Sequence, residues 1–437
     1  MSSLDVGVLS LILMVLLVYS GLYVSIALML CSYLGVWLMK GSSVLAGKLL
    51  AIVAYDSIAS YHFGVIPLFV LMGLIVSAAG IGRDAFDVAY VIFRRLRGGL
   101  GVGAVGANTL FAAITGISIA SASVFTKVAV PELIRHGYSK TFSTGVVAGS
   151  SVLGMLIPPS LLLILYGVLA EQSVGDLFLA GVTPGLLLAV FFCCGIVLMA
   201  IYFPRFIGQP ISYQEEARIE WRSLLVKSVP MLGLITLVLG GIYGGVFTPI
   251  EAGAVGCLGT FIIGVIKKAL SWQVCWSILN ETGQITASIC FLIIAAQMYS
   301  RMLAVSGLPF EFGQWITTVD IGFWGVIFAY ITVVILMGTV LDSSSIMLIL
   351  LPLVLPVVTS MNIDLIWFGI VTILAVEIGL LTPPFGLSVY VIKSTLDDSS
   401  ITLSQIFSGA APFAFMMLLV LGIVLAFPVL TTALLRW

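Results

Sequence analysis

Charged and titratable side chains are scarce in this sequence. Only 8% of its 437 residues are Asp, Glu, Lys or Arg, two are histidine, and 61% are hydrophobic. So few polar groups could not cover the surface of a soluble protein. The net charge is −1 and no basic face is present, so the composition does not point to a nucleic-acid partner.

The sequence also lacks the arrangements that hold metals or carry out catalysis. His62 and His136 stand far from any cysteine or carboxylate cluster with metal-ligand spacing. There is no Walker-type phosphate loop, and the six cysteines, which form no CxxC pair, are expected to pack as inert side chains. We therefore expect a protein that is not an enzyme, has no cofactor and does not itself hydrolyse ATP.

Long, continuous apolar runs fill the chain instead. Because they do not alternate with polar residues, they predict helices and not membrane strands, and about a dozen approach the roughly 20 residues that a spanning helix needs. We expect an all-α polytopic membrane protein. Residues 4–39 are predicted to be a retained pair of helices, since no basic region precedes them, and residues 40–62 a semi-polar connector.

Two apolar runs carry paired prolines in their middle, each pair beginning four residues after a glycine. We name residues 154–159 the first break and residues 379–384 the second break. Proline removes a backbone donor and clashes with the preceding turn, so the helices predicted at residues 141–170 and 365–394 must break there. Inside a membrane, freed carbonyls are tolerated where they line a polar cavity, and secondary transporters bind ions and substrates at such places.

Two further runs, residues 98–131 and 321–361, have small, hydroxyl-rich centres. We name these centres the first tip (residues 116–123) and the second tip (residues 338–345). Basic loops flank the first run, and the positive-inside rule places both in the cytoplasm. A re-entrant hairpin satisfies this constraint. A pair of full spans is the alternative, but about 17 residues per arm is short for it.

The order of these features repeats in the two halves of the chain. Each half has a tip, then a break, then a glycine three residues before a proline. The first hairpin enters from the basic side and the second from the opposite side, which predicts inverted repeats with a binding site between them. The expected organisation is N-terminal scaffold helices (1–64), a first repeat (65–203), a cytoplasmic connector with scaffold helices (204–284) and a second, inverted repeat (285–437).

Oxygen donors gather at the tips and breaks. Inverted symmetry would bring these four segments together near the midplane, where hydroxyls and freed carbonyls suit a hard cation such as sodium. The alternative is that serine and glycine only let helices approach closely. The predicted ion ligands are Gly116, Ser118, Ser121, Gly154, Pro158, Gly338, Asp342, Ser343, Gly379, Thr382 and Pro383, and the predicted substrate contacts are Ser123, Ser344, Ser345 and Arg301.

Ionisable side chains at membrane depth are functional candidates by default. Asp342 could accept a cation or organise the second tip through backbone hydrogen bonds. Proton coupling through Asp342 or Glu377 is the alternative to sodium. Arg301 could recognise an anionic head group or extend to the outer surface, and Glu251 is expected to cap a helix start.

Short motifs are spread over nearly the whole chain. One reads EIGLLTPP at residues 377–384, and the others occupy residues 131–138, 157–160, 177–181, 247–252, 338–342 and 351–356. Together they resemble the large membrane subunit of tripartite ATP-independent periplasmic (TRAP) transporters. Two positions depart from that family's pattern. Members often have serine where this chain has Ile117 and asparagine where it has Ala375, which bears on how ions and substrate are bound.

The resemblance implies an elevator-type, sodium-coupled symporter in the bacterial inner membrane. It also implies a small four-helix membrane subunit, expected as a separate chain, and a periplasmic substrate-binding protein that delivers a small organic anion, carboxylate or sulfonate. The alternative is a binding-protein-independent carboxylate transporter of related fold, coupled to sodium or protons. A channel is disfavoured, because one chain with two inverted half-sites offers no ring of selectivity groups.

Overall fold

The structure, a computed structural model, is all-helical. It describes residues 2–59, 61–208, 221–318, 322–396, 398 and 400–436, and no strand occurs within them. Six helices are long and apolar enough to cross a membrane, or eight if each of two bent helix pairs counts as one span, and five shorter apolar helices accompany them. The prediction of an all-α polytopic membrane protein is confirmed.

Three helices form the N-terminal part of the chain. α1 (Ser3–Tyr19) and α2 (Val24–Lys40) pack against each other, as expected for residues 4–39. The expected connector at residues 40–62 is instead mostly a helix, α3 (Ser43–Ile58). It forms because the Ser42 hydroxyl accepts a hydrogen bond from the first turn and so caps a largely apolar helix.

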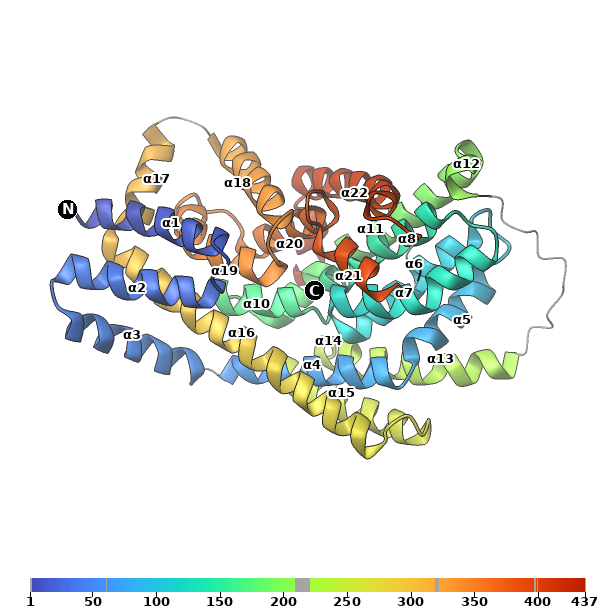
Figure 1. Cartoon of the computed structure of the whole chain (residues 1–437). Helices are drawn as coiled ribbons and strands as arrows, with labels where there is room; N and C mark the ends of the chain where they lie inside the picture. The colour runs from blue at the N-terminus through green and yellow to red at the C-terminus, as the bar shows by residue number, and fades with distance from the viewer. Residues whose placement is uncertain are drawn as a thin grey trace.

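One group of helices includes α16 (Trp272–Ser306), which runs diagonally in Figure 1 and packs against α2, α3 and α4. The Thr248 amide donates to the Glu251 carboxylate at 2.8 Å at the start of α15, which confirms the predicted cap. α4 (Val65–Ala78) joins α16 to the other members of the group, because it packs against α15 (Pro249–Ile266). α15 in turn contacts α13 (Trp221–Ile235), a π-helical turn (Thr236–Gly240) and α14 (Gly241–Tyr243).

The apolar run that begins at residue 65 is bent. α5 (Ile81–Phe93) turns 65° away from α4, and Gly80 between them has a φ of +70°, which favours glycine. α5 lies between α13 and α6. Its Asp84 and Asp87 form ion pairs with a lysine at the end of α15 and with a lysine of α13.

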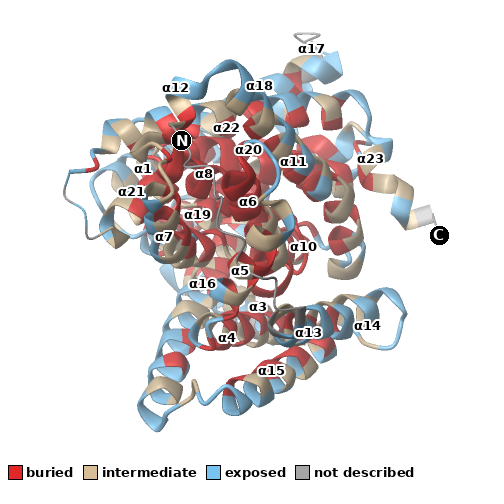
Figure 2. Ribbon diagram, turned by 90° about the vertical axis from the view of Figure 1, so that its right-hand side faces the viewer, coloured by how far each residue is buried: buried red, intermediate tan, exposed pale blue. Residues whose placement is uncertain are grey.

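The remaining helices form a second group in which buried residues are concentrated, whereas α13, α14 and α15 are largely exposed (Figure 2). From the first half of the chain it contains α6 (Gly99–Thr115), α7 (Ser118–Arg135), α8 (Lys140–Ser151), α9 (Leu153–Leu156), α10 (Leu161–Ala170) and α11 (Val174–Tyr202). From the second half it contains α18 (Gly322–Gly338), α19 (Ser343–Ser360), α20 (Leu365–Leu381), α21 (Leu387–Thr395) and α22 (Leu403–Ala426).

Some predicted segments are only partly described. The connector expected between the two halves begins with α12 (Pro204–Ile207), but residues 209–220 lie outside the described residues. The same holds for residues 319–321, where the second hairpin was expected to begin. α17 (Leu308–Thr318) precedes that gap, and α23 (Val429–Thr432) lies near the end of the chain.

The two halves of the chain meet along α8 and α22, where backbone contacts backbone. A Cβ at Gly409 would lie 2.0 Å from the carbonyl oxygen of Thr141, and a Cβ at Gly145 would lie 2.2 Å from the Gly409 carbonyl. Phe413 fills the space that Gly149 leaves open. This contact requires glycine because no side-chain rotation could relieve the overlap.

We predict that Gly409→Ala destabilises the protein. The added methyl must separate α8 from α22, and overpacking of this kind costs about 1–3 kcal/mol. Thermal unfolding of the purified protein checks this. Gly422→Ala on the same helix is the matched control, because nothing lies within 4 Å of its Cβ position. Equal effects of the two substitutions would contradict the importance of the close contact.

Candidate functional site

The first tip is a two-residue turn followed by a helix. α6 ends at Thr115 and α7 begins at Ser118, so the predicted hydroxyl-rich segment is mostly helical. Gly116 has a φ of +66°, and its carbonyl accepts the Leu161 amide at 3.0 Å. A Cβ at Gly116 would lie 2.2 Å from the Pro159 carbonyl oxygen. The first tip therefore contacts the end of the first break.

The second tip contacts the second break in the same manner. Its Thr339 carbonyl accepts the amides of Phe385 at 3.1 Å and Gly386 at 3.3 Å, just beyond the paired prolines. A Cβ at Gly338 would lie 2.7 Å from the Cα of Gly379. Both breaks interrupt their helices where predicted, and each Pro-Pro peptide bond is cis. The structure thus contains two tip-and-break pairs.

Carboxylates and hydroxyls meet at the second pair. The Asp342 side chain accepts the Ser345 amide at 3.1 Å and also the Ser345 hydroxyl, so it caps α19. Glu377 is 1% exposed and accepts the Ser343 hydroxyl at 3.3 Å, while its Oε2 has no partner among the described residues. The Thr382 hydroxyl donates to a carbonyl one turn earlier, at 2.7 Å. Of the predicted ligands of the second half, Ser343 thus contacts the second broken helix through Glu377, and Gly338 meets Gly379.

Hydroxyls without partners mark the first pair. Ser118 and Ser121, both predicted ligands, are fully buried in α7, and their hydroxyls make no hydrogen bond to any described residue. Asn108 on α6 donates to the Ser150 hydroxyl at 2.6 Å, but its own oxygen is unpaired. Buried polar atoms are normally satisfied, so these atoms are candidates for contact with a ligand. Gly154 lies against the backbone of the first tip, near Ser118.

The structure also identifies residues that the sequence reasoning missed. Ser388 on α21 is 1% exposed and unpaired within the described chain, although it was not among the predicted ligands. The one cue to it in the sequence is its position, four residues after the second proline pair. Glu377 was considered only for proton coupling, because its proximity to Ser343 depends on the packing of α20 against the second tip.

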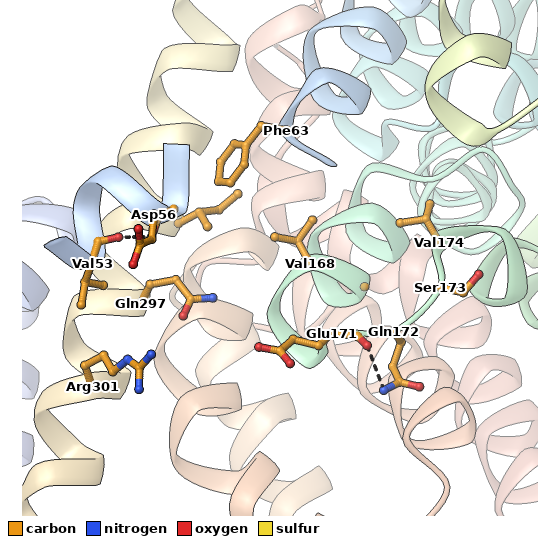
Figure 3. Close-up of a pocket in the computed structure, with 13 residues that line it drawn as sticks. Val53, Asp56, Phe63, Val168, Glu171, Gln172, Ser173, Val174, Gln297 and Arg301 are labelled. Atoms are coloured by element: carbon orange, nitrogen blue, oxygen red, sulfur yellow. Dashed lines mark hydrogen bonds between the residues drawn. The ribbon is translucent and has the colours of Figure 1, made fainter. Parts of the chain in front are cut away.

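Arg301 lies apart from the tips. It lines a cavity of about 470 Å³ between α3, α10, α16 and the start of α11, together with Asp56, Glu171 and Gln297 (Figure 3). No tip or break residue is among the described residues that line this cavity. Ser123 and Ser344 are half-buried at the tips. Arg301 is therefore separate from the predicted substrate contacts at the tips, and its own contact with substrate stays a prediction.

No group of three or more His, Cys, Asp or Glu residues in the described ranges is arranged to hold a metal ion. The donors at both pairs are instead hydroxyls, backbone carbonyls and the two carboxylates of the second pair. Hydroxyl, carbonyl and carboxylate oxygens are ligands for hard cations. This donor set can bind a small cation and can also hydrogen-bond an anion through its O–H groups.

Comparisons with known proteins cover nearly the whole chain. The family model of the tripartite ATP-independent periplasmic transporter, DctM component, matches residues 11–430. The chain is 32% identical over 389 residues to the C4-dicarboxylate TRAP transporter large permease protein DctM of Pseudomonas aeruginosa, covering 89% of each chain. It is 30% identical over 367 residues to the sialic acid TRAP transporter large permease protein SiaM of Vibrio cholerae, covering 84% of each.

A solved structure has a similar fold. The YdaH transporter of Alcanivorax borkumensis aligns with a TM-score of 0.63 and 13% identity, over 88% of this chain and 90% of that chain. The sequence matches confirm the resemblance inferred from the motifs, and they make this a multi-pass membrane transport protein and not an enzyme. The family works with a small membrane subunit and a periplasmic binding protein. The chain belongs to the DctM family of TRAP transporter large permease subunits.

Proposed function

We propose that this chain is the permease of a sodium-coupled symporter in the bacterial inner membrane that imports a small organic anion, carboxylate or sulfonate, from a periplasmic binding protein. The observation that carries this proposal is the pair of tip-and-break contacts. In each, a tip carbonyl accepts an amide from just beyond a Pro-Pro break. The named substrates of the two relatives, C4-dicarboxylate and sialic acid, support an anionic substrate.

The second pair is the proposed principal sodium site. Asp342 and Glu377 are bonded to neighbouring residues of the second tip, Ser345 and Ser343, and the buried Glu377 carboxylate, with one oxygen unpartnered in the described chain, is costly without compensation. A bound cation would offset that cost. At the first pair, the carbonyls of Gly116, Gly154 and Pro158 are the proposed ligands for a further ion. Proton coupling through Glu377 is the second candidate, because its Oε2 has no partner in the described part of the chain.

The proposed movement is of the elevator type. The helices that carry both tips and both breaks form one buried group, and the helices around α16 form another. The same arrangement of tip and break in each half supports inverted repeats. In this proposal the first group moves relative to the second and carries ion and substrate across the membrane.

Uptake into proteoliposomes tests the function. The chain is reconstituted with its small subunit, and accumulation of succinate, sialic acid or isethionate is measured with the matching binding protein under a sodium gradient or a proton gradient alone. We expect accumulation only with both sodium and the binding protein. Accumulation that follows the proton gradient without sodium would show that protons are the coupling ion, with Glu377 as the candidate carrier. Uptake without the binding protein would favour the independent carboxylate transporter.

Substitutions at Asp342 separate its two roles. Asp342→Ala removes the cap of α19 and is expected to lower the free energy of unfolding by about 0.5–2 kcal/mol, whereas Asp342→Ser keeps a cap and restores most of it. If the carboxylate also binds sodium, both variants raise the sodium concentration for half-maximal uptake. Thermal unfolding and sodium titration of uptake measure the two effects. Wild-type sodium dependence in Asp342→Ser would leave Asp342 with the capping role alone.

A further inference from the structure

Two buried hydrogen bonds join the helices that lead into the tips to the helices that lead into the breaks. Asn108 on α6 donates to the Ser150 hydroxyl on α8 at 2.6 Å. The Tyr330 hydroxyl on α18 lies 3.0 Å from the Thr372 hydroxyl on α20. We name these contacts the first and the second polar link. All four side chains are buried, and none of the four residues belongs to a tip or a break.

The two links occupy matching positions in the two halves of the chain. Asn108 stands eight residues before Gly116, and Tyr330 stands eight residues before Gly338, which places each link about 12 Å, or about two helical turns, from its tip. In both links the two partners are 42 residues apart in the sequence. Two unrelated core contacts would have no reason to share both spacings. The agreement indicates that the links have the same role in each half.

The acceptor of each link is fixed to the backbone of its own helix. The Ser150 hydroxyl donates to the Val146 carbonyl at 2.6 Å. The Thr372 hydroxyl donates to the Phe368 carbonyl at 2.8 Å. A hydroxyl has one proton, so each of the two can only accept from its partner across the link. The donor of the second link is therefore the Tyr330 hydroxyl, and each donor is tied to a hydroxyl whose rotation is already restrained.

Stability alone does not call for a polar contact at these places. Two apolar side chains of similar shape can stabilise a buried contact as well as a hydrogen-bonded pair does. The first link even has a cost, because the Asn108 amide oxygen has no partner among the described residues. What a hydrogen bond adds is direction, and a buried one specifies a single arrangement of the two helices. The links therefore fix how far one helix is shifted along the other.

A fixed register matters because each tip must reach past a break. The Gly116 carbonyl accepts the Leu161 amide at 3.0 Å, and the Thr339 carbonyl accepts the Phe385 amide at 3.1 Å. One such contact leaves the helix before the tip free to pivot about it. A second contact about two turns away removes that freedom, since two separated points fix both the depth and the rotation of a helix against its neighbour.

We infer that the two polar links position the tips over the breaks, so that each tip and its broken helix form one rigid unit. The four linked side chains are positioning residues, which act through the backbone of the tips. Each link serves its own pair, so loss of the second link should disturb the second pair and leave the first intact. The consequence for ion binding rests on the proposed function, whereas the positioning itself does not.

Hydrogen exchange of the purified protein, measured by mass spectrometry, tests the positioning directly. Tyr330→Phe deletes one hydroxyl and keeps the aromatic ring. We expect the Phe385 and Gly386 amides to exchange about 2- to 10-fold faster, the factor that one net hydrogen bond corresponds to. The Leu161 amide should be unchanged. Ser150→Ala should have the opposite effect, with faster exchange at Leu161 alone.

Tyr299→Phe is the matched control. The Tyr299 hydroxyl is buried 3.3 Å from the Ser10 hydroxyl, so this variant loses the same group at a contact between α16 and α1, which carry neither a tip nor a break. Exchange at both breaks should keep its wild-type rate. Within the second link, Thr372→Val should match Tyr330→Phe and Thr372→Ser should behave like the wild type. Combining Tyr330→Phe with Thr372→Val should add nothing, because the bond is lost only once.

The sodium dependence of uptake connects the positioning to transport. Tyr330→Phe should raise the sodium concentration for half-maximal uptake about 2- to 10-fold, since the second pair is the proposed sodium site, and Tyr299→Phe should not. Equal changes in exchange at both breaks, or none at either, would make the second link an ordinary core contact and overturn the inference. Faster exchange at Phe385 with wild-type sodium dependence would uphold the positioning and refute the proposed sodium site.

Discussion

The structure depends on satisfying backbone groups where helices are interrupted inside a membrane. A paired proline ends each broken helix and leaves amides and carbonyls that lipid cannot hydrogen-bond. In both halves, a hairpin tip supplies the missing acceptor: the Gly116 carbonyl for the first break and the Thr339 carbonyl for the second. Glycines at the contacts allow the backbones to approach this closely. The tips therefore stabilise the breaks, and an irregular backbone is retained at the position where ligands are proposed to bind.

The two tip-and-break pairs share a backbone pattern but differ in charge. The second has Asp342 and Glu377, whereas the first offers hydroxyls and an uncapped helix. A cation at a tip-and-break pair and an anionic substrate bound beside it would each lower the electrostatic cost of the other, since opposite charges attract strongly where water is excluded. Such mutual stabilisation is a physical basis for coupling, because binding both ligands is more favourable than binding either alone.

Local signals in the sequence predicted much of this arrangement. The paired prolines specified both breaks, and Gly116, with its positive φ, marked the first turn, because these residues act on their own backbone. The helical nature of residues 43–58 was missed, since the Ser42 cap is a weak signal within a semi-polar stretch. Ser388 was missed for a different reason. Its position after the proline pair was a local cue, but its burial comes from the packing of α21 against α7, α8 and α22, which are distant in the sequence.

The backbone contact between α8 and α22 has a mechanical consequence. Where Gly145 meets Gly409, no side chain lies between the two backbones that could change rotamer and absorb a displacement. Close-packed contacts of this kind transmit strain directly. A displacement of α8 at this contact would therefore be passed to α22 with little local relaxation. α8 and α22 would then move together, and ligand positions proposed in the two halves would keep their separation.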